Sequence, residues 1–198
     1  MLIGGINSYI EPIKKARIPF FTTWTTDPRE RDKEYEAWRK ENESMIHASL
    51  DAQEKYCDEA FAMSNLAGAL LQLAAMCIQK YSEQESPPDI FKGVIKPKSI
   101  PAKFNIGRLV KDIPMGLIIY AGRNQFNHHN EDDLREPSLS IFETMCEFKS
   151  PYLKGQSFRD PAFDLNNELI DNYAHNITAL LEWERYEKYE EDMLSLFE

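Results

Sequence analysis

The stretch LAGALLQLAAMCI, residues 66–78, is the most apolar part of the 198-residue chain. It lies within residues 29–86, which contain no proline and a single glycine, Gly68. Apolar residues recur there three and four positions apart, the spacing of one helix face: Tyr35 and Trp38, then Phe61, Leu66, Leu70, Leu73 and Cys77. We therefore expect two helices, or one very long bent helix, between Pro28 and about Tyr81.

The predicted helical segment has a clear start. Asp27 suits the N-cap position, Pro28 suits the first helical position, and Glu30 stands three residues after Asp27, as in a capping box. Residues 1–26 mix glycine, proline, β-branched and aromatic residues without a helical period. We therefore expect residues 1–26 to form an extended N-terminal arm and residues 27–198 to form a single helical domain.

Beyond Pro87 and Pro88, which end that segment, the predicted helices are shorter. Residues 89–104 contain one glycine and two prolines and predict a loop. Helices are expected over residues 105–120, from Pro137 onward, and from Asp160–Pro161 onward. No segment alternates apolar and polar residues as a strand does, so the predicted fold class is all-α, an up-and-down helical bundle with the N-terminal arm attached.

The composition favours a protein of the reducing cytoplasm. Cys57, Cys77 and Cys146 are odd in number and widely spaced, unlike a disulfide framework or a zinc site. The first 15 residues lack the basic region of a secretory signal, and the apolar run 66–78 is shorter than the roughly 20 residues of a membrane helix. With 33 acidic and 23 basic residues, the net charge is -10. This charge argues against a surface that coats nucleic acid or a membrane as a whole.

The basic residues are concentrated in one stretch. Between Ile90 and Lys111 there are six basic residues and no acidic one: Lys92, Lys96, Lys98, Lys103, Arg108 and Lys111. Residues 182–198, by contrast, hold seven acidic residues and two basic ones. A basic stretch in an acidic chain attracts a polyanion, so these six residues are a predicted phosphate-binding set. The alternative is an ordinary solvated loop.

The densest polar stretch is GRNQFNHH at residues 122–129, followed by an acidic turn, NEDD, at residues 130–133. It combines a permanent cation, Arg123, with an amide, Asn124, and two imidazoles, His128 and His129. These groups suit cleavage of an RNA phosphodiester without a metal. A base takes the 2′-OH proton, an acid protonates the leaving oxygen, and a cation offsets the charge that builds on phosphorus.

The segment RNQFNH at residues 123–128 resembles the motif of the HEPN domains. In that motif four to six residues separate an arginine from a histidine, and the residue right after the arginine is commonly Asn, Asp or His. HEPN domains are all-α bundles, and many are endoribonucleases. The predicted order of helices agrees in outline, since the motif falls in the second half of the bundle. Residues 1–59 lie outside the resemblance.

The resemblance implies a homodimer in which two copies of the motif form one RNA-cleaving cleft. Arg123 would stabilise the transition state, Asn124 would orient the phosphate or its partner residue, and His128 would act as general base or acid, with His129 as an auxiliary. The six basic residues would flank the cleft and bind RNA. No metal and no organic cofactor is implied. A role as a toxin or defence factor would require a neutralising antitoxin partner.

Other interpretations of the motif stay open. In the first, Arg123 and Asn124 would bond the last carbonyls of a helix, and the two histidines would be exposed loop residues. Alternatively, a metal ion would be held by His128, His129, Glu131, Asp132 and Asp133. The chain would otherwise be a non-catalytic HEPN-like dimer that binds RNA, a nucleotide or a protein, or a helical interaction protein with a large apolar patch away from the motif. Of these interpretations, only catalysis requires Arg123 and His128 to converge across a cleft.

Overall fold

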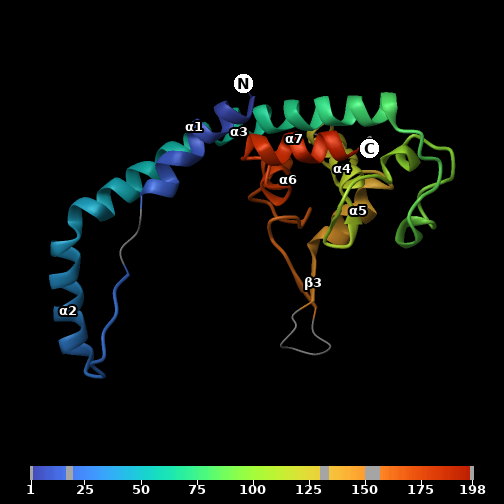
Figure 1. The fold of residues 1–198 in the computed structure, drawn as a ribbon. Helices are drawn as coiled ribbons and strands as arrows, with labels where there is room; N and C mark the ends of the chain where they lie inside the picture. The colour runs from blue at the N-terminus through green and yellow to red at the C-terminus, as the bar shows by residue number, and fades with distance from the viewer. Residues whose placement is uncertain (1, 17–19, 130–133, 150–156, 197–198) are drawn as a thin grey trace. The chain divides into compact units, whose positions relative to one another are not determined.

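A computed structural model describes residues 2–16, 20–129, 134–149 and 157–196 of the chain (Figure 1). It is mostly helical, with 63% helix, which confirms the all-α class. Contacts between residues divide the chain into an N-terminal unit, residues 4–63, and a C-terminal unit, residues 64–198 with residues 1–3. This division falls inside helix α3 (Glu43–Tyr81) and not at residue 27, the predicted boundary.

Helix α1 (Leu2–Lys15) occupies residues for which the sequence predicted an extended arm, so that prediction is wrong here. Ile3, Ile6 and Ile10 are buried and stand three and four positions apart, so they form one face of a helix. Two glycines and Pro12 lower the local helix propensity and hid this spacing. Burial of the isoleucine face outweighs that local preference.

Helix α2 (Pro28–Glu41) begins where the sequence predicted. The Asp27 side chain accepts a hydrogen bond of 2.9 Å from the backbone N–H of Arg29, which satisfies one of the donors left free at a helix start. Residues 20–27 form neither helix nor strand, so the extended arm is confirmed for this short part. Helix α3 follows after Asn42.

Ring contacts hold the segment 20–27 against α2. The ring centroid of Phe21 lies 5.3 Å from that of Tyr35 and 5.6 Å from that of Trp38. The hydroxyl of Thr23 also donates a hydrogen bond to Glu34. No residue of α2 is buried, so this helix depends on caps and surface contacts rather than on a core.

Helix α4 (Met115–Asn127) is the centre of the C-terminal unit. It packs against α5 (Ser138–Cys146), against α6 (Ala174–Leu180) and against the short 3-10 helix η2 (Pro101–Phe104). Eight of its residues are buried. The motif therefore lies on the most central helix of this unit. Another 3-10 helix, η1 (Asp89–Phe91), belongs with η2 to the predicted loop.

Two glycines allow close packing around α4. A Cβ atom on Gly68 of α3 would lie 2.2 Å from the ring of Phe126, and one on Gly122 would lie 2.5 Å from Ile177 of α6. Both distances are shorter than any atomic contact between carbons. The absence of a side chain at these two positions lets α3 and α6 approach the motif-bearing end of α4.

Helix α3 is long and apolar enough to cross a membrane, judged by length and composition alone. An 18-residue window in its 39 residues has a mean hydropathy of 1.6, whereas the sequence prediction counted only the unbroken run 66–78. However, 44% of that window is buried inside the protein, and core helices of soluble proteins pass the same test. It is the one such helix in the described residues, and it is weak evidence for a membrane span.

The helix predicted over residues 105–120 is partly wrong. Strands β1 (Leu109–Val110) and β2 (Ile113–Pro114) form a short antiparallel hairpin, and α4 starts only after it. The turn residues Lys111 and Asp112 have φ angles of 50° and 63°, which suit the tight turn of a two-residue hairpin and exclude a right-handed helix. Pro114 would also clash with a preceding helical turn.

The helix predicted from Pro137 is confirmed as α5, but the helix predicted from Asp160–Pro161 is wrong. After the hairpin of β3 (Glu147–Lys149) and β4 (Ser157–Arg159), the chain forms turns and then α6 and α7 (Tyr186–Ser195). Side chains within the turns bond the backbone N–H two residues onward, at Asp160, Asp164, Asn167 and Asn172. Such bonds compete with helix formation, which the apolar spacing alone did not reveal.

A buried carboxylate connects α7 to the segment before β1. Asp192 is 2% exposed and accepts bonds of 2.8 and 3.0 Å from the Arg108 guanidinium and one of 2.9 Å from the Trp183 indole N–H. Burial raises the pKa of the Asp192 carboxyl, but the hydrogen bonds from Arg108 and Trp183 outweigh burial and hold that pKa below its ordinary value. Arg108 is therefore part of the structural core.

Candidate functional site

The RNQFNH motif forms the last turn of α4 and its C-cap. His128 is the cap residue, and its backbone N–H donates bonds of 3.1 and 3.2 Å to the carbonyls of Asn124 and Gln125. The His128 side chain is exposed at this end of the helix. The motif thus lies at the C-terminus of α4, where the bonds from the His128 N–H hold the backbone in place.

Two side-chain amides attach this turn to its neighbours. The amide of Asn124 donates a 3.0 Å bond to the hydroxyl of Ser138, the first residue of α5. The buried Gln125 donates to the carbonyl of Asp171 at 2.9 Å and accepts from the backbone N–H of Tyr173 at 3.0 Å. Gln125 therefore has a structural role, and Asn124 is held in one orientation beside His128.

Arg123 is half-buried, with its guanidinium carbon 5.9 Å from the centroid of the Tyr120 ring. Its Nε atom is buried and has no hydrogen-bond partner in the structure. Among the described residues, no carboxylate forms an ion pair with Arg123. Its charge is thus not neutralised by the described part of the protein.

Two hollows open beside the motif, and His128 lines both. The first hollow, of about 380 Å³, is lined by Tyr120, Asn124, His128, Leu134, Arg135, Glu136 and Ser138. The second hollow, of about 390 Å³, has His129, residues 165–168, Ile170 and Asp171 in its wall. Arg123 lines neither of them. The structure therefore brings Asn124 and His128 together and places Arg123 on a neighbouring side of the helix, since consecutive helical residues point about 100° apart.

His129 is turned back towards the helix end. Its Nδ1 atom lies 2.9 Å from the carbonyl oxygen of Phe126, and the two rings are stacked with centroids 6.5 Å apart. In the metal-site interpretation His129 acts with Glu131, Asp132 and Asp133, which lie outside the described residues. Within the described residues, no group of three or more His, Cys, Asp or Glu side chains has the arrangement of a metal site.

Two of the six predicted phosphate-binding residues are engaged inside the protein. Arg108 pairs with Asp192 and also donates a 2.9 Å bond to the carbonyl of Leu181. Lys111 pairs with Asp160 at 2.9 Å and donates to the carbonyl of Met145. These contacts give both residues a structural role, and binding of RNA by them stays a prediction.

The four remaining lysines are more exposed but lie away from the motif. Lys92 pairs with Asp89 at 2.6 Å and Lys98 with Glu85 at 4.0 Å, while Lys103 donates to the carbonyl of Gln79. Lys96 is exposed and forms no ion pair with the described residues.

The loop that carries these lysines contacts the first turn of α4. A Cβ atom on Gly116 would lie 2.4 Å from the Phe104 carbonyl oxygen. The Asn124–His128 turn is about 12–18 Å further along the helix axis at 1.5 Å per residue. The loop therefore does not flank the motif within one copy of the chain.

Five residues of the first hollow were not predicted from the sequence: Tyr120, Leu134, Arg135, Glu136 and Ser138. Tyr120 stands four positions before Asn124, and this spacing on one helix face is a signal that was available. Arg135 and Ser138 follow the acidic turn, and no local pattern connects them with the motif. Their position depends on how α5 packs against α4.

The fold and the site were compared with known proteins. No family model, no curated protein sequence and no solved structure matches the chain.

Proposed function

We propose that the chain is a metal-independent endoribonuclease of the HEPN type that acts as a homodimer. The observation that carries this proposal is that Asn124 and His128 line one hollow. Arg123, which forms no ion pair with a described carboxylate, is the residue before Asn124 on the same helix. An amide, an imidazole and a cation at one helix end are the groups that metal-free phosphodiester cleavage requires.

In the proposed reaction, His128 of one copy removes the proton of a ribose 2′-OH. The 2′-oxygen attacks the adjacent phosphorus, the bond between phosphorus and the 5′-oxygen breaks, and the second copy's His128 donates a proton to that leaving oxygen. The products are a 2′,3′-cyclic phosphate and a 5′-hydroxyl. Arg123 stabilises the charge on the phosphorus oxygens, while Asn124, held by Ser138, orients the phosphate.

A homodimer is part of this proposal because one copy of the motif supplies a single well-placed imidazole, whereas the reaction needs both a base and an acid. A closed two-fold pair is the commonest symmetric assembly and brings equivalent surfaces together. Light scattering at micromolar concentration is expected to give twice the 23.0 kDa mass of the chain. A mass of one chain at that concentration would contradict the composite site.

The activity test uses a labelled RNA and the same strand with 2′-O-methyl groups. Cleavage is expected to persist in EDTA and to require the 2′-OH. Replacing Arg123 or His128 by alanine is expected to lower the rate by about 100-fold or more, the scale of losing a general base or a charge-stabilising donor. His129→Ala is the matched control and should lower the rate much less. Loss of cleavage in EDTA that a divalent ion restores would favour the metal site instead.

The second candidate function is a non-catalytic dimer that binds RNA, a nucleotide or a protein. The position of Arg123 outside both hollows favours this candidate, because catalysis requires the cation to reach the phosphate that the ribose 2′-oxygen attacks. Full cleavage by the Arg123→Ala, His128→Ala double variant would exclude the proposed mechanism, whereas a native chain that binds RNA without cleaving it would leave binding as the function.

We further propose a cytoplasmic toxin or defence factor that an antitoxin partner neutralises. The three cysteines are free, as expected of a protein in a reducing compartment. A ribonuclease of broad specificity in the cytoplasm requires such control. Expression of the chain in cells should arrest growth, and the His128→Ala variant should relieve the arrest.

A further inference from the structure

The first hollow contains a cation, Arg135, that no carboxylate in the described part of the chain pairs with. Arg135 lies in its wall, is exposed, and forms no ion pair with any described carboxylate. Arg108 and Arg159 of the C-terminal unit differ from Arg135 in this respect. Arg108 pairs with Asp192, and Arg159 pairs with Glu143 at 2.9 Å and with Asp164 at 2.9 Å. The charge of Arg135 is thus available on the same wall as His128.

The carboxylate in the same wall, that of Glu136, accepts hydrogen bonds from Ser140. Glu136 accepts a bond of 2.9 Å from the Ser140 hydroxyl at one oxygen and a bond of 3.3 Å from the Ser140 backbone N–H at the other. Glu136 therefore serves the first turn of α5, where a negative charge is favourable because the free N–H groups carry partial positive charge. It forms no ion pair with Arg135.

The remaining wall supplies neutral polar groups with fixed positions. The Ser138 hydroxyl accepts the bond from Asn124, which leaves its own O–H available as a donor, and both residues line the hollow with Arg135. A planar guanidinium with hydroxyl and imidazole donors around it matches the tetrahedral oxygens of a phosphate. The volume of about 380 Å³ lies in the range of small-ligand pockets.

We infer that Arg135 binds a backbone phosphate of single-stranded RNA in the first hollow, the role that the sequence assigned to residues 92–111. Ser138 positions Asn124 at the same phosphate group. This inference deepens the proposed function and rests on it for the identity of the ligand as RNA. The phosphate-binding step itself involves no bond cleavage, so it is measured separately from catalysis.

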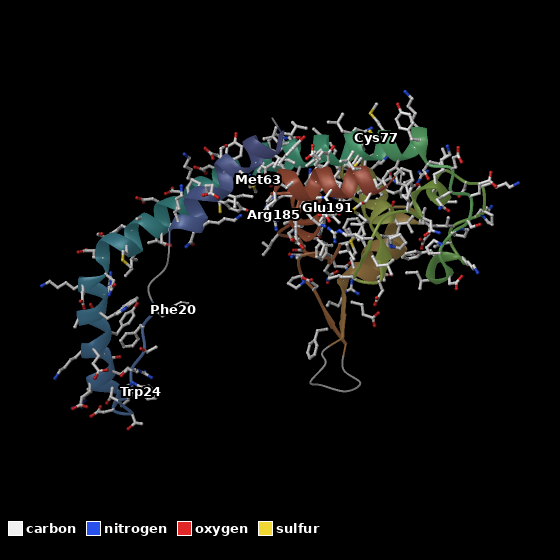
Figure 2. The ribbon with its side chains drawn as sticks, in the orientation of Figure 1. Phe20, Trp24, Met63, Cys77, Arg185 and Glu191 are labelled. Carbon is white, nitrogen blue, oxygen red and sulfur yellow. The ribbon has the colours of Figure 1, made fainter. Side chains whose placement is uncertain are left out.

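The test measures anisotropy of a fluorescent single-stranded RNA in which every 2′-OH is methylated, so that the strand binds without being cleaved. Arg135→Gln in the full chain is expected to weaken binding by about 10-fold. It should also reduce the slope of log affinity against log salt by about 0.7, the effect of losing one phosphate contact. Arg185→Gln is the matched control because Arg185, labelled in Figure 2, is exposed and within the described ranges pairs with Glu182 alone, at 3.9 Å. It should change affinity by less than about 2-fold.

The inference is overturned by unchanged affinity in Arg135→Gln, by equal losses in the two arginine variants, or by a native chain that does not bind the strand. Thermal unfolding midpoints of both variants should equal that of the native chain, since both side chains are exposed. If Arg135→Gln keeps its affinity while His128→Ala abolishes cleavage of unmodified RNA, the proposed function stands and this site is wrong. If affinity depends on Arg135 but the native chain cleaves no RNA, the site stands and the proposed enzyme is wrong.

Discussion

The two units of the chain are stabilised in different ways. In the C-terminal unit, large side chains such as Phe104, Phe142 and Trp183 are fully buried. In the N-terminal unit, Phe20, Trp24 and Phe61 are exposed to 92%, 97% and 76%, and no residue of α2 is buried. Figure 2 shows Phe20 and Trp24 on the segment that precedes α2. The difference shows that burial holds the C-terminal unit together, whereas caps and local ring contacts hold much of the N-terminal one.

This contrast concerns function because the motif belongs entirely to the C-terminal unit. Its helix, α4, is fixed by buried neighbours, so a site at its end keeps its geometry. We therefore expect substitutions of equal size to have unequal effects in the two units, and the following experiments test this contrast.

The largest effect is expected from Trp183→Ala. Trp183 is 0% exposed, and truncating a buried tryptophan costs about 4 kcal/mol of unfolding free energy through lost contacts and a cavity. Trp24→Ala, the matched change at a side chain that is 97% exposed, should alter that free energy by less than about 0.5 kcal/mol. Urea unfolding followed by circular dichroism measures both. Equal losses would remove the proposed contrast.

A loss of about 3 kcal/mol is expected from Asp192→Asn, because the half-buried Arg108 guanidinium then loses the buried carboxylate that accepts two of its hydrogen bonds. The pKa of Asp192 is depressed in the folded protein, so its carboxylate contributes stability at pH values above the unfolded pKa of about 3.9. That contribution is lost as the pH falls through the folded pKa.

The difference in unfolding free energy between native and Asp192→Asn chains should therefore be constant from pH 5 to 7 and shrink below about pH 4. Glu187, an exposed residue of the same helix, supplies the control. Glu187→Gln should change the unfolding free energy by less than about 0.5 kcal/mol, both at pH 5 to 7 and below about pH 4. A difference that grows as the pH falls would contradict the sign of the pKa shift.

Gly68→Ala is expected to cost about 2 kcal/mol by overpacking, because the new Cβ would lie 2.2 Å from the Phe126 ring. Since Phe126 is in the motif, the same variant should lower RNA cleavage as well as the melting temperature. Gly93→Ala introduces the same methyl group where no atom lies within 4 Å, and it should leave both quantities unchanged. An unchanged melting temperature in Gly68→Ala would mean that the Phe126 ring moves aside without cost.

The smallest expected effect is in the N-terminal unit. Asp27→Ala removes the N-cap bond to Arg29 and should cost about 1 kcal/mol of local α2 stability. Amide hydrogen exchange should accelerate in the first turns of α2 and stay unchanged in α4. Asp32→Ala, in the middle of α2, should leave exchange unchanged because Asp32 caps nothing. Faster exchange in α4 would show that the two units unfold as one.

The sequence predicted those elements whose cause is local. The Asp27 cap contacts a residue two positions away, so the start of α2 is visible in a short window. The turn at Lys111 and Asp112 is different, because Lys111 bonds Asp160, which is 49 residues away. No pattern near residue 111 predicts that contact. The apolar spacing on both sides of residue 111 therefore suggested a continuous helix.

The difference between local and distant contacts also explains which site residues could be predicted from the sequence. Asn124 and His128 were recognised because they share one helix end, and the structure places them in one hollow. The pairing of Arg108 was not predicted because its partner, Asp192, is 84 residues away, so the charge looked free in the sequence. Arg135 was missed because its place beside His128 arises from packing between two helices.

The tryptophans give the protein a built-in optical readout. Trp183, fully buried in the C-terminal unit, should emit at short wavelength and resist a dissolved quencher, whereas Trp24, 97% exposed in the N-terminal unit, should emit at long wavelength and be quenched readily. Trp38, half-buried beside Phe21, should fall between them. Unlabelled protein therefore reports on its two units at separate wavelengths, so the melting of one is distinguishable from the melting of the other in a single cuvette.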